Sequence, residues 1–192
     1  MFFLELAGNF FTVLCVFLAA RNHVLTWPVG IIGSLLYGIM FYESKLYADV
    51  ALQGFFILTS LKGWINWQHK KQVADLPITR TGKKHLFLFY VPAGILAAIF
   101  YGYMLFKLTD ASFPFLDSVI LTFSVIGQLL LMKRRLETWL FWIIVDLIAV
   151  PLYGLKGLYM TSGVYFLFLL NAVYGFWQWR HIFRRQAEGP RA

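Results

Sequence analysis

A few polar side chains stand within long apolar stretches of this sequence, and they are the first candidates for chemistry. Gln53, Asp146 and Asn171 each lie deep in such a stretch. A bilayer offers no water to satisfy these groups, so they are expected to face a bundle interior or an aqueous path. A carboxylate such as Asp146 costs ~2.5–3.5 kcal/mol near the centre of a membrane helix unless it is compensated. These positions therefore indicate where a solute is handled.

The stretch 47–67 carries a polar stripe. At ~100° per residue, one face of a helix over this stretch holds Asp49, Gln53, Phe56, Ser60, Gly63 and Trp67. The Gln53 amide offers both donors and an acceptor, which suits the polar groups of a solute. The alternative is a hydrogen bond between helices, which needs only one partner. Asp49 either contributes directly or pairs with Lys45 four residues earlier.

A second polar face is predicted on the stretch 138–153. Trp139, Trp142, Asp146 and Tyr153 share this face through spacings of three, four and seven residues. Trp142 suits either a ligand contact or packing. Asp146 has three alternative roles. It offsets a substrate's positive charge, forms an ion pair with the intramembrane Lys62, or couples transport to protons.

The stretch 160–179 mixes hydrogen-bonding and aromatic groups within an arc of ~120°. These residues are Thr161, Tyr165, Phe168, Asn171 and Gly175. Asn171 is the preferred polar contact, because it lies deep in the stretch. In the stretch 27–42, Tyr37 and Ser34 are the candidates for polar contacts with the solute. Tryptophans also anchor helices at membrane interfaces, and Trp64, Trp177 and Trp179 lie near predicted helix ends, which favours that role for them.

The composition predicts a single integral membrane domain. Of 192 residues, 60% are hydrophobic and 14% charged, with a mean hydropathy of +0.68. The net charge of +8 does not indicate nucleic-acid binding, because the basic residues are confined to short loops and the C-terminal tail. The sequence has one cysteine and no phosphate-binding glycine loop, so we expect no disulfide, cofactor or metal. The first stretch lacks a basic leader, which predicts a retained helix.

Seven apolar stretches reach or approach the ~17–25 residues of a membrane helix. They cover residues 3–20, 27–42, 47–67, 86–106, 113–132, 138–153 and 160–179. Outside these stretches, 13 Lys and Arg residues fall on one side of the membrane and three on the other. The positive-inside rule therefore predicts an N-terminus outside and a C-terminus in the cytoplasm, with a frayed tail after Arg180.

The two halves of the sequence repeat each other weakly. Adding 112 to a residue number pairs Trp27 with Trp139, Tyr47 with Tyr159, Gly63 with Gly175 and Trp67 with Trp179. Three crossings reverse the chain and one extra span restores its direction, so the two three-helix units are expected to be parallel. Such a 3+1+3 parallel repeat is typical of transporters, with a substrate site near mid-membrane between the halves.

The predicted divisions follow from this repeat. Residues 1-68 form the first three-helix repeat, 69-107 a cytoplasmic loop and linker helix, 108-180 the second three-helix repeat, and 181-192 a cytoplasmic tail. The expected fold class is an all-α integral membrane protein with seven transmembrane helices.

Several short motifs run along almost the whole chain. They are Trp27-Pro28-Val29-Gly30, Lys45-Leu46-Tyr47-Ala48-Asp49, Leu52-Gln53, Gly63-Trp64-x-x-Trp67, Glu137-x-Trp139-x-x-Trp142 and Lys156-Gly157-Leu158. Their combined spacing resembles that of the PnuC family of vitamin transporters. The resemblance implies a fold similar to full-length SWEET transporters and a homotrimer in the bacterial inner membrane. It also implies facilitated diffusion (uniport) of nicotinamide riboside, a cationic vitamin B3 precursor of NAD, with thiamine as the alternative substrate.

Both vitamins are cationic aromatics, so an indole face would add a cation–π attraction of ~0.5–2 kcal/mol and Asp146 would offset the charge. The resemblance also implies a substrate-contacting glutamine at Gln53. The expected substrate-binding residues are Gln53, Trp142, Asp146, Asn171, Tyr165, Tyr37, Trp139 and Ser60. The expected partners are a small-molecule vitamin, membrane lipid and further copies of the chain. The alternative from another class is an intramembrane enzyme that uses Asp146 and Asp49 as acid and base.

Overall fold

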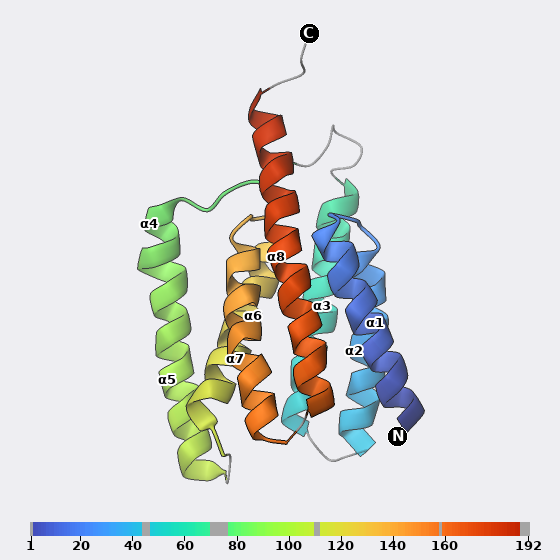
Figure 1. Ribbon diagram of the computed structural model, residues 1–192, viewed down its shortest axis with the longest axis vertical. Coiled ribbons are helices and arrows are strands. Elements are labelled where there is room, and N and C mark those ends of the chain that lie inside the picture. The colour runs from blue at the N-terminus through green and yellow to red at the C-terminus, as the bar shows by residue number, and fades with distance from the viewer. Residues whose placement is uncertain (1, 44–46, 70–76, 110–111, 158, 189–192) are drawn as a thin grey trace. The chain divides into compact units, whose positions relative to one another are not determined.

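The computed structural model describes residues 2–43, 47–69, 77–109, 112–157 and 159–188, and they are almost entirely helical. Each of the seven predicted apolar stretches is confirmed as a helix (Figure 1). The seven long helices are α1 (Phe2–Ala20), α2 (Thr26–Glu43), α3 (Tyr47–His69), α5 (Val91–Leu108), α6 (Pro114–Met132), α7 (Thr138–Leu155) and α8 (Tyr159–Glu188).

Two features of the helices differ from the sequence-based expectation. α8 continues to Glu188, so the prediction of a frayed chain after Arg180 is wrong over those residues. A short helix α4 (Lys83–His85) and a π-helical turn η2 (Leu86–Tyr90) precede α5. Pro92 follows this turn at the start of α5, where its ring would clash with the carbonyl four residues earlier in a regular helix. The wider π turn therefore accommodates the proline.

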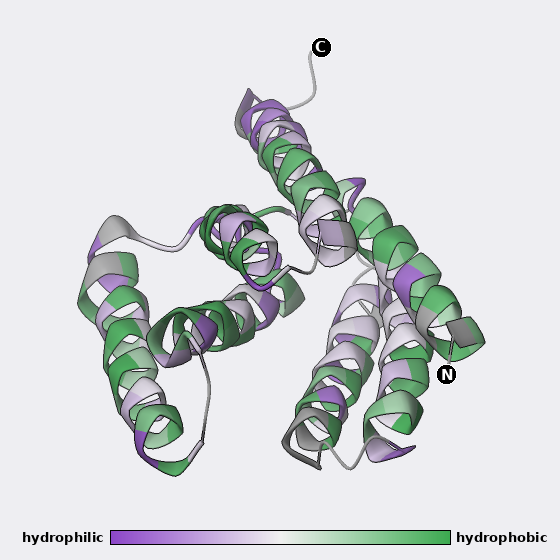
Figure 2. Ribbon diagram, turned by 60° about the horizontal axis from the view of Figure 1, so that its bottom comes forward, coloured by the Kyte–Doolittle hydropathy of each residue, from purple (hydrophilic) through white to green (hydrophobic). Residues whose placement is uncertain are grey.

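Hydrophobic residues run along much of the long helices, whereas hydrophilic residues gather in α8 toward the C-terminus (Figure 2). By length and composition, the described segments Leu88–Leu108, Pro114–Met132 and Thr138–Leu155 are able to cross a membrane, and Leu6–Ala20 is a shorter apolar helix. Every long helix exposes large apolar side chains, such as Leu96 on α5. So much exposed apolar surface is suited to lipid rather than water.

The chain divides into two compact units, which are described separately. The first unit comprises Met1–Ile78 and Gln178–Ala192, and the second comprises Thr79–Trp177. In the first unit α1 packs on α2 and α2 packs on α3, and in the second unit α5, α6 and α7 pack in the same consecutive way.

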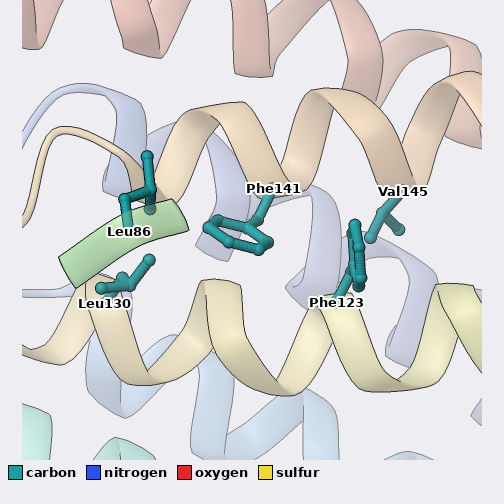
Figure 3. Packing of buried hydrophobic residues seen from close by; sticks show 5 residues of the cluster. All are labelled: Leu86, Phe123, Leu130, Phe141 and Val145. Carbon is teal, nitrogen blue, oxygen red and sulfur yellow. The ribbon is translucent and has the colours of Figure 1, made fainter. Parts of the chain in front are cut away.

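The core of the second unit lies between α6 and α7. Phe123 and Phe141 meet edge to face with their ring centroids 5.5 Å apart. Figure 3 shows Leu86 and Leu130 beside this pair and Val145 at its other end. Because these side chains come from α6, α7 and η2, the cluster fixes the position of α7, which carries three of the eight predicted site residues.

The connection before α4 is joined to the turn between α6 and α7. Thr79 donates its backbone N–H to the Arg134 carbonyl and accepts from the N–H of Leu136, both at 3.0 Å. The carboxylate of the nearly buried Glu137 accepts the backbone N–H of Thr81 at 2.9 Å. The start of α7 is therefore held by a segment that lies outside every apolar stretch.

The turns that lead into α2 and α7 have matching geometry at positions 112 residues apart. Thr26 Oγ1 donates to the Cys15 carbonyl at 2.8 Å, and Thr138 Oγ1 donates to the Gly127 carbonyl at 2.7 Å. Asn22 and Arg134 occupy the same place in their turns, and both adopt a left-handed backbone with φ of 56° and 50°. The aligned sequences therefore fold alike locally.

The aligned Trp–Gly pairs also make the same contact in each unit. A Cβ on Gly63 of α3 would lie 2.5 Å from Trp27 Cη2, and a Cβ on Gly175 of α8 would lie 2.7 Å from Trp139 Cζ2. Both indoles are almost fully buried. Glycine is needed at these positions because any side chain would occupy the volume of an indole.

Candidate solute-binding site

Asp146 is a buried carboxylate of the second unit. Its exposed fraction is 2%, and its carboxylate has no hydrogen bond or ion pair among the described residues. Trp142 lies one helical turn earlier and is half-buried. Its indole lies against Gly127, where an added Cβ would be 3.2 Å from Nε1. A carboxylate without a counterion therefore lies one turn from an aromatic ring on α7.

Trp139 and Lys62 were also predicted to act with Asp146, and they differ from Trp142 in their exposure. Trp139 has an exposed fraction of 2% and packs on Gly175, so its ring supports the contact between α7 and α8. Lys62, the predicted alternative counterion, belongs to α3 of the first unit and is exposed.

The helices α7 and α8 bring several aromatic rings together. Tyr165 stacks on Tyr153 with centroids 5.0 Å apart and an angle of 27° between the rings. Tyr165 also meets Phe168 edge to face at 5.7 Å. Ser162 Oγ donates to the Val150 carbonyl at 2.8 Å, which fixes the two helices at this end. The predicted faces of α7 and α8 therefore meet at Tyr153 and Tyr165.

Asn171 is half-buried on α8. The contact of Tyr153 with Tyr165 and that of Trp139 with Gly175 show that α7 and α8 run antiparallel. Asp146 and Asn171 both fall between these two contacts along their helices. The carboxylate and the amide therefore belong to the middle section of the α7–α8 pair.

In the first unit, the predicted site residues lie on α2 and α3. Tyr37 donates its hydroxyl to Asn9 Oδ1 of α1 at 2.6 Å, so part of its hydrogen-bonding capacity is used within the unit. Ser60 is buried near Gly30, with Oγ 3.8 Å from the position of an added Cβ.

Gln53 is half-buried on α3, and its Cβ would lie 3.7 Å from a Cβ on Gly38. Its side-chain amide makes no hydrogen bond to other described residues. The proposed pair of Asp49 with Lys45 lies outside the side chains that the structure describes. Of the first-unit candidates, Gln53 thus keeps its polar group available.

The tryptophans at one end of the first unit form a buried cluster. Trp27 and Trp67 meet edge to face at 5.1 Å, and Trp67 lies 6.2 Å from Trp179. Trp179 is fully buried and donates Nε1–H to the Ala19 carbonyl at 3.2 Å. The predicted interfacial role is therefore wrong for Trp179, whereas Trp177 is 62% exposed and fits that role.

Sequence reasoning missed two polar pairs. One is Asn9 with Tyr37, and the other is Asp117 with Lys156, whose Nζ–Oδ1 distance is 2.8 Å. Partners 28 and 39 residues apart leave no local pattern. The only signals in the sequence were Asn9, which lies within an apolar stretch, and Asp117, which lies near the start of one.

Comparison with known proteins identifies the family. The model of a family described as "Nicotinamide mononucleotide transporter" matches residues 2–181 of this chain. The chain belongs to this family. The sequence-based assignment to PnuC-like transporters is therefore confirmed, and the chain is a multi-pass membrane protein.

Individual relatives agree with this membership. The nicotinamide riboside transporter PnuC of Escherichia coli (strain K12) is 26% identical, over 92% of this chain and 84% of PnuC. PnuC of Neisseria mucosa is 24% identical, over 91% of this chain and 71% of that protein. The riboflavin/roseoflavin transporter RibM of Streptomyces davaonensis is also 24% identical, over 91% of this chain and 83% of RibM.

A solved structure shares the fold. The crystal structure of the vitamin B3 transporter PnuC superposes with a TM-score of 0.75, covering 95% of this chain and 83% of the other at 22% identity. This chain and that transporter therefore share a fold.

Proposed function

We propose that this chain imports nicotinamide riboside across the bacterial inner membrane. Family membership and the relatives named nicotinamide riboside transporters support transport of this vitamin. The observation that carries the proposal is the buried Asp146 carboxylate, which lies one turn from the Trp142 indole and has no counterion among the described residues. A pyridinium ring supplies both the missing charge and a partner for the indole.

This chemistry separates the candidate substrates. Nicotinamide riboside carries a fixed positive charge on its ring, whereas riboflavin, the substrate in the name of RibM, is uncharged. A buried carboxylate favours the cation, because an unpaired charge is costly in a membrane interior. Thiamine is also cationic, but the relatives described above do not favour it. A transporter family likewise gives no support to an intramembrane enzyme that uses Asp146.

In the proposed complex, each polar side chain has a separate task. In the second unit, Trp142 stacks on the pyridinium ring, Asp146 balances its charge, and Asn171 and Tyr165 bond to ribose hydroxyls. In the first unit, Gln53 pairs with the carboxamide, since its amide has both donors and an acceptor. Trp139, Ser60 and Tyr37 complete the proposed set of substrate-binding residues. Their contacts within the protein are with Gly175, Gly30 and Asn9, respectively.

The proposed architecture is a 3+1+3 parallel repeat, similar to full-length SWEET transporters. Its divisions are 1-68, 69-107, 108-180 and 181-192. The matching Thr–carbonyl hydrogen bonds and Trp–Gly contacts at positions 112 residues apart support the duplication. The extra crossing is α5 with its preceding turn. A homotrimer is part of the same proposal.

The proposed transport mode is uniport by facilitated diffusion, without enzymatic activity. The N-terminus is outside and the C-terminus is cytoplasmic, because 13 Lys and Arg residues lie on the C-terminal side and three on the other. Uniport requires no coupling ion, so uptake of this cation should follow its own electrochemical gradient, which includes the membrane potential.

The test is uptake of labelled nicotinamide riboside into proteoliposomes of the purified protein, with and without a pH gradient. We expect uptake above that of protein-free vesicles, unchanged by the pH gradient and suppressed by excess unlabelled nicotinamide riboside. Excess thiamine and riboflavin should suppress it far less. Uptake equal to that of protein-free vesicles would refute the function, and uptake only with a pH gradient would refute uniport.

A further inference from the structure

An ion pair joins the start of α6 to the end of α7 in the second unit. Lys156 Nζ lies 2.8 and 3.0 Å from the two carboxylate oxygens of Asp117. Their side chains are 24% and 28% exposed, so solvent and small solutes reach both. An ion pair this accessible is worth at most ~1 kcal/mol, and its partners exchange readily.

The same ammonium lies above an aromatic ring. Lys156 Nζ is 5.8 Å from the ring centroid of Tyr153, within the ~6 Å range of a cation–π contact. Tyr153 in turn stacks on Tyr165 at 5.0 Å. The Lys156 ammonium is thus a built-in cation that is held by one carboxylate and one aromatic face. A cationic aromatic solute would need the same two groups.

We propose that Asp117 and Tyr153 form an entry subsite for N-alkylpyridinium cations, which bind there by displacing the Lys156 ammonium. The inference rests on the proposed function and adds a second binding position to it. The exchange conserves charge, because one monovalent cation leaves the carboxylate as another arrives. It therefore avoids leaving Asp117 partly buried and unpaired, which would be costly.

The location of the subsite suits entry. It lies at the end of α6 and α7 opposite the basic turn Lys133, Arg134 and Arg135, so the proposed orientation directs it outward. From Tyr153 the ring contacts continue to Tyr165 and then to Phe168 on α8. A pyridinium ring that leaves Asp117 therefore has a row of aromatic residues beside it on the way to the level of Asp146.

The subsite also gives a role to Lys156, which lies on the side of the protein that has few basic residues. A fixed ammonium without a function would repel a cationic substrate at its point of entry. An ammonium that is held by Asp117 does not repel it, because the pair is neutral. When the substrate takes its place, the freed Lys156 side chain has four flexible bonds with which to swing into solvent.

The test compares two forms of one substrate in proteoliposomes. Nicotinamide riboside carries the pyridinium charge, and its reduced dihydropyridine form has nearly the same shape without the charge. Initial uptake rates of both give KM values for the unaltered protein, Lys156→Met, Asp117→Asn and the double variant. Monodisperse elution and thermal midpoints of each purified variant establish that it is folded.

Lys156→Met should lower KM for the charged form about two- to five-fold, the factor that corresponds to a partly exposed cation–π contact. KM for the reduced form should stay unchanged. Asp117→Asn should raise KM for the charged form only, and the double variant should lose the gain of Lys156→Met. Equal changes for both forms, or no change in any variant, would overturn the subsite. Those outcomes leave uptake by the unaltered protein intact, whereas its absence would refute the proposed function itself and this inference with it.

Discussion

Replacing the buried glycines that face the indoles should destabilise the protein in both units. Gly63→Ala places a Cβ 2.5 Å from Trp27 Cη2, and Gly175→Ala places one 2.7 Å from Trp139 Cζ2. Carbon atoms prefer separations of about 3.5–4.0 Å, so each overlap is on the order of 1 Å. Trp27 cannot easily yield, because it is buried and packs against the Trp67 ring, with the ring centroids 5.1 Å apart.

The cost of this overlap can be isolated by matched controls. Gly54 on α3 and Gly163 on α8 have nothing within 4 Å of an added Cβ. Gly→Ala at those positions gains up to ~1 kcal/mol from helix propensity. The same gain applies at Gly63 and Gly175, but overpacking there costs ~1–3 kcal/mol. The difference between each variant and its control on the same helix is therefore ~1–3 kcal/mol.

The assay is the midpoint of thermal loss of monodisperse protein in detergent. For a chain of this length, 1 kcal/mol corresponds to about 2–4 °C, so each variant should melt ~2–12 °C below its control. Both units should respond alike, because the contact recurs at positions 112 residues apart. Midpoints of Gly63→Ala and Gly175→Ala equal to those of Gly54→Ala and Gly163→Ala would refute the packing argument.

The remaining predictions concern the proposed site and one buried hydrogen bond. Trp142→Ala should raise the Kd for nicotinamide riboside ~2- to 30-fold by calorimetry, as loss of a cation–π contact predicts, while the exposed Trp177→Ala leaves it unchanged. Asp146→Asn should weaken binding of the charged form more than that of the reduced form, and equal weakening would exclude a charge role. Thr138→Val should cost ~1 kcal/mol of stability by removing a buried 2.7 Å bond, whereas Thr109→Val, whose 2.7 Å bond is exposed, should cost less.

The helices could be predicted from the sequence because hydropathy reports them directly. The predicted stretch 27–42 corresponds to the helix Thr26–Glu43, and the predicted stretch 113–132 corresponds to the helix Pro114–Met132. The end of α8 was missed for a physical reason. Hydropathy falls after Arg180, but the backbone hydrogen bonds of a helix continue in polar surroundings, with Arg184 and Arg185 exposed on its surface.

The candidate site could be predicted only in part. The face of α7 follows from helical periodicity, which correctly put Trp142 one turn before Asp146. Periodicity does not say which indole is buried, and so Trp179 was assigned to the membrane interface although it is enclosed beside Trp67. The burial of an indole depends on a glycine or a ring of another helix, which no single stretch reveals.

Long-range polar contacts escaped the sequence for a similar reason. Glu137 lies just after the basic residues Lys133, Arg134 and Arg135, yet it is nearly buried and accepts a hydrogen bond from the backbone N–H of Thr81. The pair of Asp117 and Lys156 joins the far ends of two helices. The first contact depends on how the segment before α4 lies against the start of α7, and the second depends on how α6 and α7 pack. Neither leaves a local pattern in the sequence.

The central claim is that this chain alone moves nicotinamide riboside down its gradient, and counterflow measures this most directly. Proteoliposomes loaded with unlabelled nicotinamide riboside are diluted into a trace of the labelled compound, without any ion gradient. The account predicts a transient accumulation of label above equilibrium, larger for the unaltered protein than for Trp142→Ala. Label that never exceeds the level of protein-free vesicles would contradict it.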